Sequence, residues 1–156
     1  METNFPLLEY NFQKARLLIV EDNDDMWTIT RFALRKEFPE LQLDRVASCK
    51  QALTYLTTCI EENRPLPKLI LQDLYMPDRE EGLSLLRAVR QQLAAGSWPQ
   101  LPIVITSSSS DPNDIQACYQ HGASSYIVKP SNPSSQSSIF QAVRRFWWET
   151  SVLPLT

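Results

Sequence analysis

The chain has 156 residues, of which 43% are hydrophobic and 21% charged, and its formal net charge is −3. This length suits one compact domain with a buried core. The acidic balance argues against a surface that tracks nucleic-acid phosphates, and no apolar run is long enough to span a bilayer. The first residues lack the basic stretch of a secretory signal, so we expect a cytoplasmic protein.

Apolar runs of strand length alternate along the chain with segments of helical period. The predicted strands, in chain order, cover residues 17–20, 41–46, 69–71, 103–105 and 126–128. The helices between them are predicted over 24–38, after the N-cap Ser48, up to the C-cap near Gly96, from Asp111-Pro112 to about 121, and over about 138–149. Such alternation predicts an α/β fold with a parallel sheet and helices on both faces.

Three cysteines, Cys49, Cys59 and Cys118, have no short metal-ligand spacing, and we expect them to be reduced and buried. His121 is the one histidine of the sequence, so the usual His/Cys zinc sites cannot be assembled.

Polar residues stand at the carboxyl ends of four predicted strands: Glu21-Asp22, Asp73, Ser107 and Lys129. In a parallel sheet these ends share one edge, which is where ligands bind. Each of these residues alone is common in loops, and only their joint placement at the strand ends favours a functional site. Two carboxylates about 4 Å apart repel by about 4 kcal/mol at an effective dielectric near 20, and a hard divalent cation such as Mg²⁺ relieves this.

With Mg²⁺ neutralising phosphoryl oxygens, one carboxylate of this set is free to attack phosphorus and form an aspartyl phosphate. The ammonium of Lys129 and the hydroxyl of Ser107 are suited to contact the remaining phosphoryl oxygens. The expected chemistry therefore consists of positioning and charge neutralisation.

Residues 15–149 resemble the receiver domains of two-component response regulators. The matching segments are LLIVEDNDD, LILQDLYMP, PIVITSS and YIVKP. The chain length and the tail FWWETSVLP resemble the stand-alone regulators that pair with bacterial phytochromes, chiefly those of cyanobacteria.

This resemblance implies a flavodoxin-like, doubly wound sheet of order 2-1-3-4-5 and a switch rather than an enzyme. It implies that Asp73 accepts the phosphoryl group, with Lys129 and Ser107 assisting. The metal would be Mg²⁺, held by Asp22, Asp73 and the main-chain carbonyl of Tyr75, with Glu21 acting through water. Tyr126 would turn inward on activation while Ser107 moves to the phosphate. A cis Lys129-Pro130 bond is implied as well.

Two details depart from a simple match. The spacing from Pro102 selects Ser107 as the switch hydroxyl, but Thr106 is adjacent and would serve if the strand were one residue shorter. Gly82 lies five residues after Pro77, where receivers usually place a glycine four residues after that proline. The inserted residue is expected to reshape the loop beside the site.

The domain organisation is predicted as an N-terminal arm over 1–14, a receiver domain over 15–149 and an apolar tail over 150–156. Because no DNA-binding segment follows the last helix, the expected partners are a histidine kinase, phytochrome-like by resemblance, and a downstream protein target. The last helix and the tail carry more apolar residues than one core-facing helix face needs, namely Phe146, Trp148 and the apolar tail. They favour a homodimer through the fourth predicted helix, the fifth strand, the last helix and the tail, or else packing of the tail on its own domain. The apolar arm packs either on the domain or on a partner.

Three other functions have weaker support in the sequence. A receiver-like module that acts without phosphorylation is supported only by the spacing of Gly82. An aspartyl-phosphate phosphatase needs a second acid–base aspartate two residues after the nucleophile, where this chain has Tyr75. A flavin binder needs a phosphate-cradling hydroxyl loop after the first strand, where this chain has acidic residues.

Overall fold

In a computed structural model, which describes residues 5–96, 100–132 and 135–154, the strands form one parallel sheet in the order β2-β1-β3-β4-β5. The strands are β1 (Arg16–Val20), β2 (Gln42–Val46), β3 (Leu69–Asp73), β4 (Ile103–Ser107) and β5 (Ser125–Val128). The helices are α1 (Phe5–Phe12), α2 (Asp24–Glu37), α3 (Cys49–Glu61), α4 (Arg79–Ala94), α5 (Pro112–Gln120) and α6 (Gln136–Val143), and a π-helical turn (Arg144–Trp148) follows α6.

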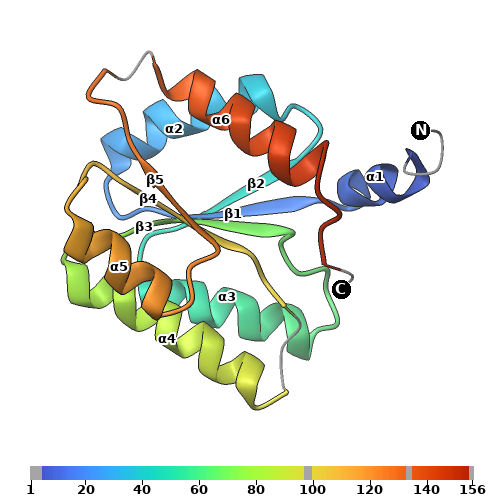
Figure 1. Ribbon diagram of the computed structural model, residues 1–156. Coiled ribbons are helices and arrows are strands. Elements are labelled where there is room, and N and C mark those ends of the chain that lie inside the picture. Colours follow the sequence, from blue (N-terminus) through green and yellow to red (C-terminus); the bar gives the residue numbers. More distant parts are fainter. Residues whose placement is uncertain (1–4, 97–99, 133–134, 155–156) are drawn as a thin grey trace.

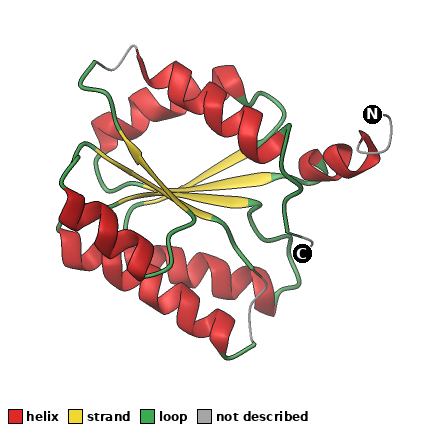
Figure 2. Cartoon of the chain, viewed as in Figure 1, coloured by secondary structure: helices red, strands yellow, loops and turns green. Residues whose placement is uncertain are grey.

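Helices cover both faces of this sheet, as Figure 1 shows, with α2 and α6 on one face and α3, α4 and α5 on the other. The helices and the central strands form three layers (Figure 2). The predicted doubly wound fold and strand order are therefore confirmed. The strand order reverses between β1 and β3, the point at which such sheets bind ligands.

The pleat of each strand divides the core into two apolar layers, because successive side chains point to opposite faces. Leu18, Val20, Ile70, Ile103 and Ile105 belong to the layer that includes residues of α3 and α4. The alternate residues pack with α2 and α6: Leu17, Ile19, Leu69, Leu71 and Val104. This alternation also decides which polar residues at the strand ends can face one another.

Helix starts follow the predicted capping chemistry. The hydroxyl of Ser48 accepts a hydrogen bond from the Gln51 amide at 3.1 Å, and the carboxylate of Asp111 accepts one from the Asn113 amide at 2.9 Å, with Pro112 in the first helical turn. The three cysteines are free thiols and buried, as expected.

The N-terminal arm contains the helix α1, which packs on the chain's own C-terminal segment (Figure 1), one of the two alternatives that the sequence left open. Asn11 is fully buried there. Its amide group donates to the carbonyls of Trp148 (2.9 Å) and Ser151 (2.7 Å) and accepts from the Leu153 amide (2.9 Å). The indole of Trp148 donates back to the Asn11 carbonyl at 3.0 Å. The arm is thus fixed to the domain by a cluster of buried hydrogen bonds.

Trp148 and the tail residue Leu153 pack on the chain's own domain, which is one of the two alternatives that the sequence left open. Trp148 is fully buried, with its ring 5.0 Å from that of Phe38, and Leu153 is 1% exposed. The last predicted helix is divided, because α6 ends at Val143 and the chain continues as the π-helical turn to Trp148. Residues 1–4 of the predicted arm and 155–156 of the predicted tail lie outside the described residues. Within the described ranges, no helix has the length and apolar character needed to cross a membrane.

Candidate functional site

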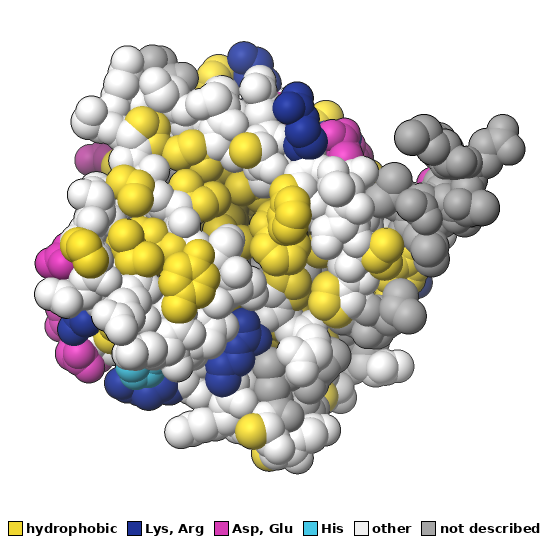
Figure 3. Space-filling model, in the orientation of Figure 1, with side chains coloured by type: hydrophobic (Ala, Val, Ile, Leu, Met, Phe, Trp, Pro, Cys, Tyr) yellow, Lys and Arg dark blue, Asp and Glu magenta, His cyan; other side chains and the backbone are white. Residues whose placement is uncertain are grey.

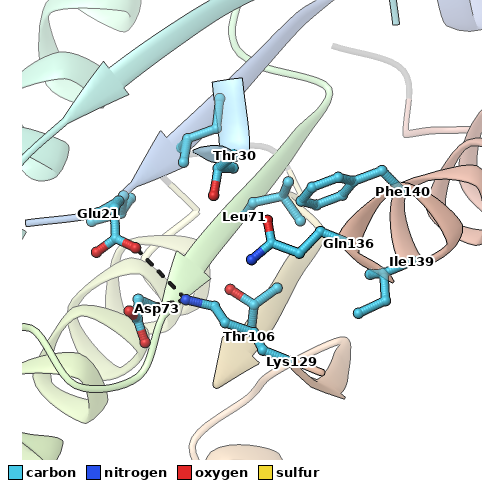
Figure 4. A pocket seen from close by; sticks show the side chains of 11 residues that line it. Glu21, Thr30, Leu71, Asp73, Thr106, Lys129, Gln136, Ile139 and Phe140 are labelled. Atoms are coloured by element: carbon cyan, nitrogen blue, oxygen red, sulfur yellow. Dashed lines mark hydrogen bonds and ion pairs between the residues drawn. The ribbon is translucent and has the colours of Figure 1, made fainter. Parts of the chain in front are cut away.

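The carboxyl ends of β1, β3 and β5 bring three predicted residues together. The Lys129 ammonium lies 3.3 Å from an Asp73 carboxylate oxygen and 3.6 Å from a Glu21 carboxylate oxygen. Figure 4 shows these side chains converging from different elements, with Lys129 reaching toward both carboxylates. The predicted convergence of the early acidic turn, the mid-chain aspartate and the late lysine is therefore present.

Glu21 is the buried member of this set, at 3% exposure. Burial raises the pKa of Glu21 and the negative charge of Asp73 raises it further, while the Lys129 ammonium lowers it. The backbone amide of Asn23 donates to its carboxylate at 3.3 Å, and Arg45 donates to its carbonyl at 2.8 Å. The acidic turn is thus held in place, and added positive charge would favour its ionised form.

The predicted metal ligands are only partly assembled. Asp22 is exposed, and within the described residues no group of three His, Cys, Asp or Glu side chains lies close enough to hold a metal ion. Tyr75 follows the acceptor strand, and its amide donates to an Asp73 carboxylate oxygen at 3.3 Å. The donor set is nonetheless all oxygen, which suits a hard cation. Such an ion would relieve the repulsion by Asp73, which adds to the effect of burial in raising the pKa of Glu21.

A small cavity of about 30 Å³, with room for about one water molecule, is lined in part by Glu21, Asp73 and Lys129. Its polar lining includes Thr30, Thr106 and Gln136 besides the charged residues (Figure 4). Gln136 is 5% exposed, and its amide oxygen has no hydrogen-bond partner among the described residues. Gln136 and Thr30 were not predicted as site residues, since a single polar residue in a helix gives no signal in the sequence until the helices are packed.

Thr106, and not Ser107, lines this cavity. Thr106 is paired in register with Asp73, so the two side chains share one face of the sheet, and Ser107 points to the other. Ser107 is 1% exposed, and its hydroxyl accepts a hydrogen bond from the Ser109 amide at 3.1 Å. Ser107 is therefore beside the site but turned away from Asp73.

Tyr126, the predicted switch aromatic, is half-buried and donates its hydroxyl to the Ser109 carbonyl at 2.8 Å. Ser109 thus contacts both predicted switch residues. Its own hydroxyl donates to the buried carboxylate of Asp114 at 2.6 Å. Hydrogen bonds from Ser109 and Tyr75, with the nearby Arg79 guanidinium, keep the pKa of Asp114 below its ordinary value.

The loop after Asp73 accommodates the inserted residue without losing the close approach of Gly82. A Cβ at residue 82 would collide with the carbonyl oxygen of Leu74, and the Gly82 carbonyl accepts from the buried Gln72 side chain at 2.7 Å. The cis peptide bond of the described residues precedes Pro77; the cis bond expected at Lys129-Pro130 is not found.

The fold and the site together define a class of protein: a doubly wound parallel sheet with an acidic pocket and a lysine at its topological switch point. The chain belongs to the response regulator receiver domain family, whose model matches residues 17–143. Receiver domains are signalling switches of two-component systems and work with histidine kinases.

Three relatives illustrate the match. Response regulator Rcp1 of Synechocystis is 27% identical over 139 residues, covering 88% of this chain and 92% of Rcp1. A crystal structure of its Mn²⁺-bound form superposes with a TM-score of 0.75, at 27% identity over 90% of this chain and 99% of that chain.

Two further solved structures are similar. The response regulator RPA3017, in red light signaling of R. palustris, has a TM-score of 0.79 at 26% identity over 91% of this chain and 99% of that one. The phosphorylated cyanobacterial phytochrome response regulator RcpA has a TM-score of 0.77 at 27% identity over 90% of this chain and 99% of that one.

Proposed function

We propose that this chain is a phosphorylation switch that accepts a phosphoryl group on Asp73 from a histidine kinase in a Mg²⁺-dependent step. The observation that supports this most directly is the convergence of Asp73, Glu21 and Lys129, with Lys129 within 3.3 Å of Asp73 and 3.6 Å of Glu21. The sheet presents this set at its ligand-binding edge.

The chemistry requires one bond to form and one to break. A carboxylate oxygen of Asp73 attacks phosphorus of the phosphohistidine, the phosphorus–nitrogen bond breaks, and the imidazole leaves with the bonding electrons and takes up a proton. Lys129, already paired with Asp73, is available to neutralise a phosphoryl oxygen. The hydroxyl of Ser107 would move to the phosphoryl group and Tyr126 would turn inward, which defines the second state of the switch.

We assign the metal site to Asp22, Asp73 and the Tyr75 carbonyl, with Glu21 acting through water. A bound Mg²⁺ supplies positive charge to the phosphoryl oxygens. The Mn²⁺-bound form of Rcp1 supports a divalent ion in a relative of this chain. Burial and the negative charge of Asp73 raise the pKa of Glu21, and such an ion would relieve the repulsion between these two carboxylates.

The upstream partner that we propose is a phytochrome-like histidine kinase, because RcpA is described as a cyanobacterial phytochrome response regulator and RPA3017 as acting in red light signaling. Histidine kinases draw on ATP, which implies a cytoplasmic location. Output would pass through contacts with a downstream protein.

Exposed apolar side chains on α5, β5, the π-helical turn and the tail favour a homodimer. Trp148 and Leu153 are buried, but Tyr119, Val128, Phe146 and Val152 remain 50%, 42%, 56% and 48% exposed, on α5, β5, the π-helical turn and the tail. Figure 3 shows hydrophobic side chains gathered on the face that α5 and β5 share. We expect light scattering to report the mass of two chains. A monomer mass at every concentration tested would rule the dimer out.

Phosphorylation is tested by incubating the protein with Mg²⁺ and acetyl phosphate and measuring its intact mass. We expect a gain of one phosphoryl group that needs Mg²⁺ and disappears in Asp73→Asn. Glu62→Gln, at an exposed carboxylate outside the site, is the control and should retain the gain. No gain with either the small donor or a kinase would favour a module that acts without phosphorylation.

A further inference from the structure

The buried carboxylate of Asp114, in the first turn of α5, connects two loops that border Asp73. It is 5% exposed and accepts hydrogen bonds from the Tyr75 phenol at 2.8 Å and the Ser109 hydroxyl at 2.6 Å. The guanidinium of Arg79 lies 2.7 Å from its other oxygen. A buried carboxylate with three such partners is a rigid junction, since freeing any one of them would leave it undercompensated.

The partners of Asp114 come from two segments, one that follows β3 and one that follows β4. Tyr75 and Arg79 belong to the loop and helix start that follow Asp73, and the Tyr75 amide donates to the Asp73 carboxylate at 3.3 Å. Ser109 lies in the loop that joins β4 to α5. The phenol of Tyr75 therefore spans from the acceptor loop to the loop that carries the switch hydroxyl.

Ser109 in turn holds both switch residues. Its amide donates to the Ser107 hydroxyl at 3.1 Å, and its carbonyl accepts from the Tyr126 hydroxyl at 2.8 Å. Because Ser107 faces away from Asp73 in this arrangement, it must leave the Ser109 amide before it can reach a phosphoryl group. Any restraint on Ser109 is thus a restraint on the switch.

We propose that Asp114 is a positioning residue that fixes Ser109 to Tyr75 and so holds Ser107 and Tyr126 in the arrangement of the unphosphorylated protein. This inference rests on the proposed function. A restraint on one of two states lowers the population of the other, and with it the rate of any step that needs the other state. Removing the restraint therefore accelerates phosphorylation without adding a chemical group to the site.

The test is the initial rate of phosphorylation by acetyl phosphate and Mg²⁺ in Asp114→Asn. Loss of the charge-assisted bonds is expected to raise this rate roughly three- to tenfold. In a Ser107→Ala background the same substitution should change the rate less than about twofold, because the hydroxyl whose release it promotes is absent. A purely structural role for Asp114 would not depend on Ser107.

The control is Asp111→Asn, three positions earlier in the chain. Asp111 caps the same helix and asparagine caps equally well, so the rate should stay at the wild-type value. If Asp114→Asn does not fold, the double variant Tyr75→Phe/Ser109→Ala removes both hydroxyl donors and leaves the Arg79 pair in place.

An unchanged or slower rate, or acceleration that persists in the Ser107→Ala background, would overturn the role of Asp114. These results are distinct from failure of the proposed function, in which the wild-type protein itself would gain no phosphoryl group.

Discussion

At the residue scale, two adjacent hydroxyls differ in what they face. Thr106 shares the face and the cavity of Asp73, whereas Ser107 is turned to the other face and bonded to the Ser109 amide. If Ser107 is the switch hydroxyl, Ser107→Ala should still be phosphorylated on Asp73 but should lose the phosphorylation-induced change around Tyr126. Thr106→Val keeps the shape of the side chain and removes its hydroxyl, and this variant should retain the phosphorylation-induced change around Tyr126.

Amide NMR spectra of β5 and the loop before α5, recorded with and without a phosphodonor, would measure this change. If Thr106→Val abolished the spectral change and Ser107→Ala did not, the choice of Ser107 would be wrong.

The carboxyl of Glu21 links function to stability. Burial and Asp73 raise its pKa in the folded protein, so its contribution to stability is present below its unfolded pKa and is lost as the pH rises through the folded value. At neutral pH without metal, Glu21→Gln should therefore raise Tm by about 2–4 °C, or about 1 kcal/mol. The same variant should gain less than wild type from added Mg²⁺ in thermal denaturation. If Glu21→Gln had a lower Tm than the wild-type protein in EDTA, this explanation of the raised pKa would be wrong.

At the element scale, the start of α4 depends on a glycine. Alanine is favoured over glycine inside a helix by about 1 kcal/mol. At residue 82, however, a Cβ would collide with the backbone carbonyl of Leu74. Gly82→Ala should therefore destabilise the protein by about 1–3 kcal/mol in urea denaturation. Ser84→Ala, two residues later on the same helix, is the control and should stay within about 0.5 kcal/mol. Stabilisation by Gly82→Ala would show that the contact is relieved.

The elements that the sequence predicted best are those with strong periodicity and local caps. The strands, the Ser48 and Asp111 caps and the alternation of strands and helices each follow from a few neighbouring residues. The hydroxyl at the end of β4 that faces the site was harder to predict, because Thr106 and Ser107 differ only in the face of the sheet to which the strand's pleat turns them. The helix α1 was missed, since its place depends on contacts between Asn11 and residues more than a hundred positions away.

At the scale of the whole molecule, the two ends of the chain stabilise each other. Asn11→Ala would leave the carbonyls of Trp148 and Ser151 and the amide of Leu153 without their partner. We expect a loss of about 2–4 kcal/mol in the free energy of unfolding, measured with urea. Gln13→Ala, at an exposed position next to the same helix, should change it by less than about 0.5 kcal/mol. An equally small change for Asn11→Ala would mean that the ends are not coupled.

The predicted site could be read from the sequence because β1, β3 and β5 end at one edge of the sheet, so Glu21, Asp73 and Lys129 had to meet there. The junction at Asp114 could not, since it joins Tyr75 and Ser109 through positions with no shared sequence pattern. The burial of Trp148 likewise depends on α1, which covers a surface that the sequence alone left open.

The most direct test of the central claim is the chemical identity of the phosphorylated residue. After treatment with a phosphodonor and Mg²⁺, borohydride reduces an acyl phosphate to an alcohol, and peptide mass mapping then locates it. We expect homoserine at position 73, with Glu21 and Asp22 unmodified. Reduction at another carboxylate, with Asp73 unchanged, would contradict it.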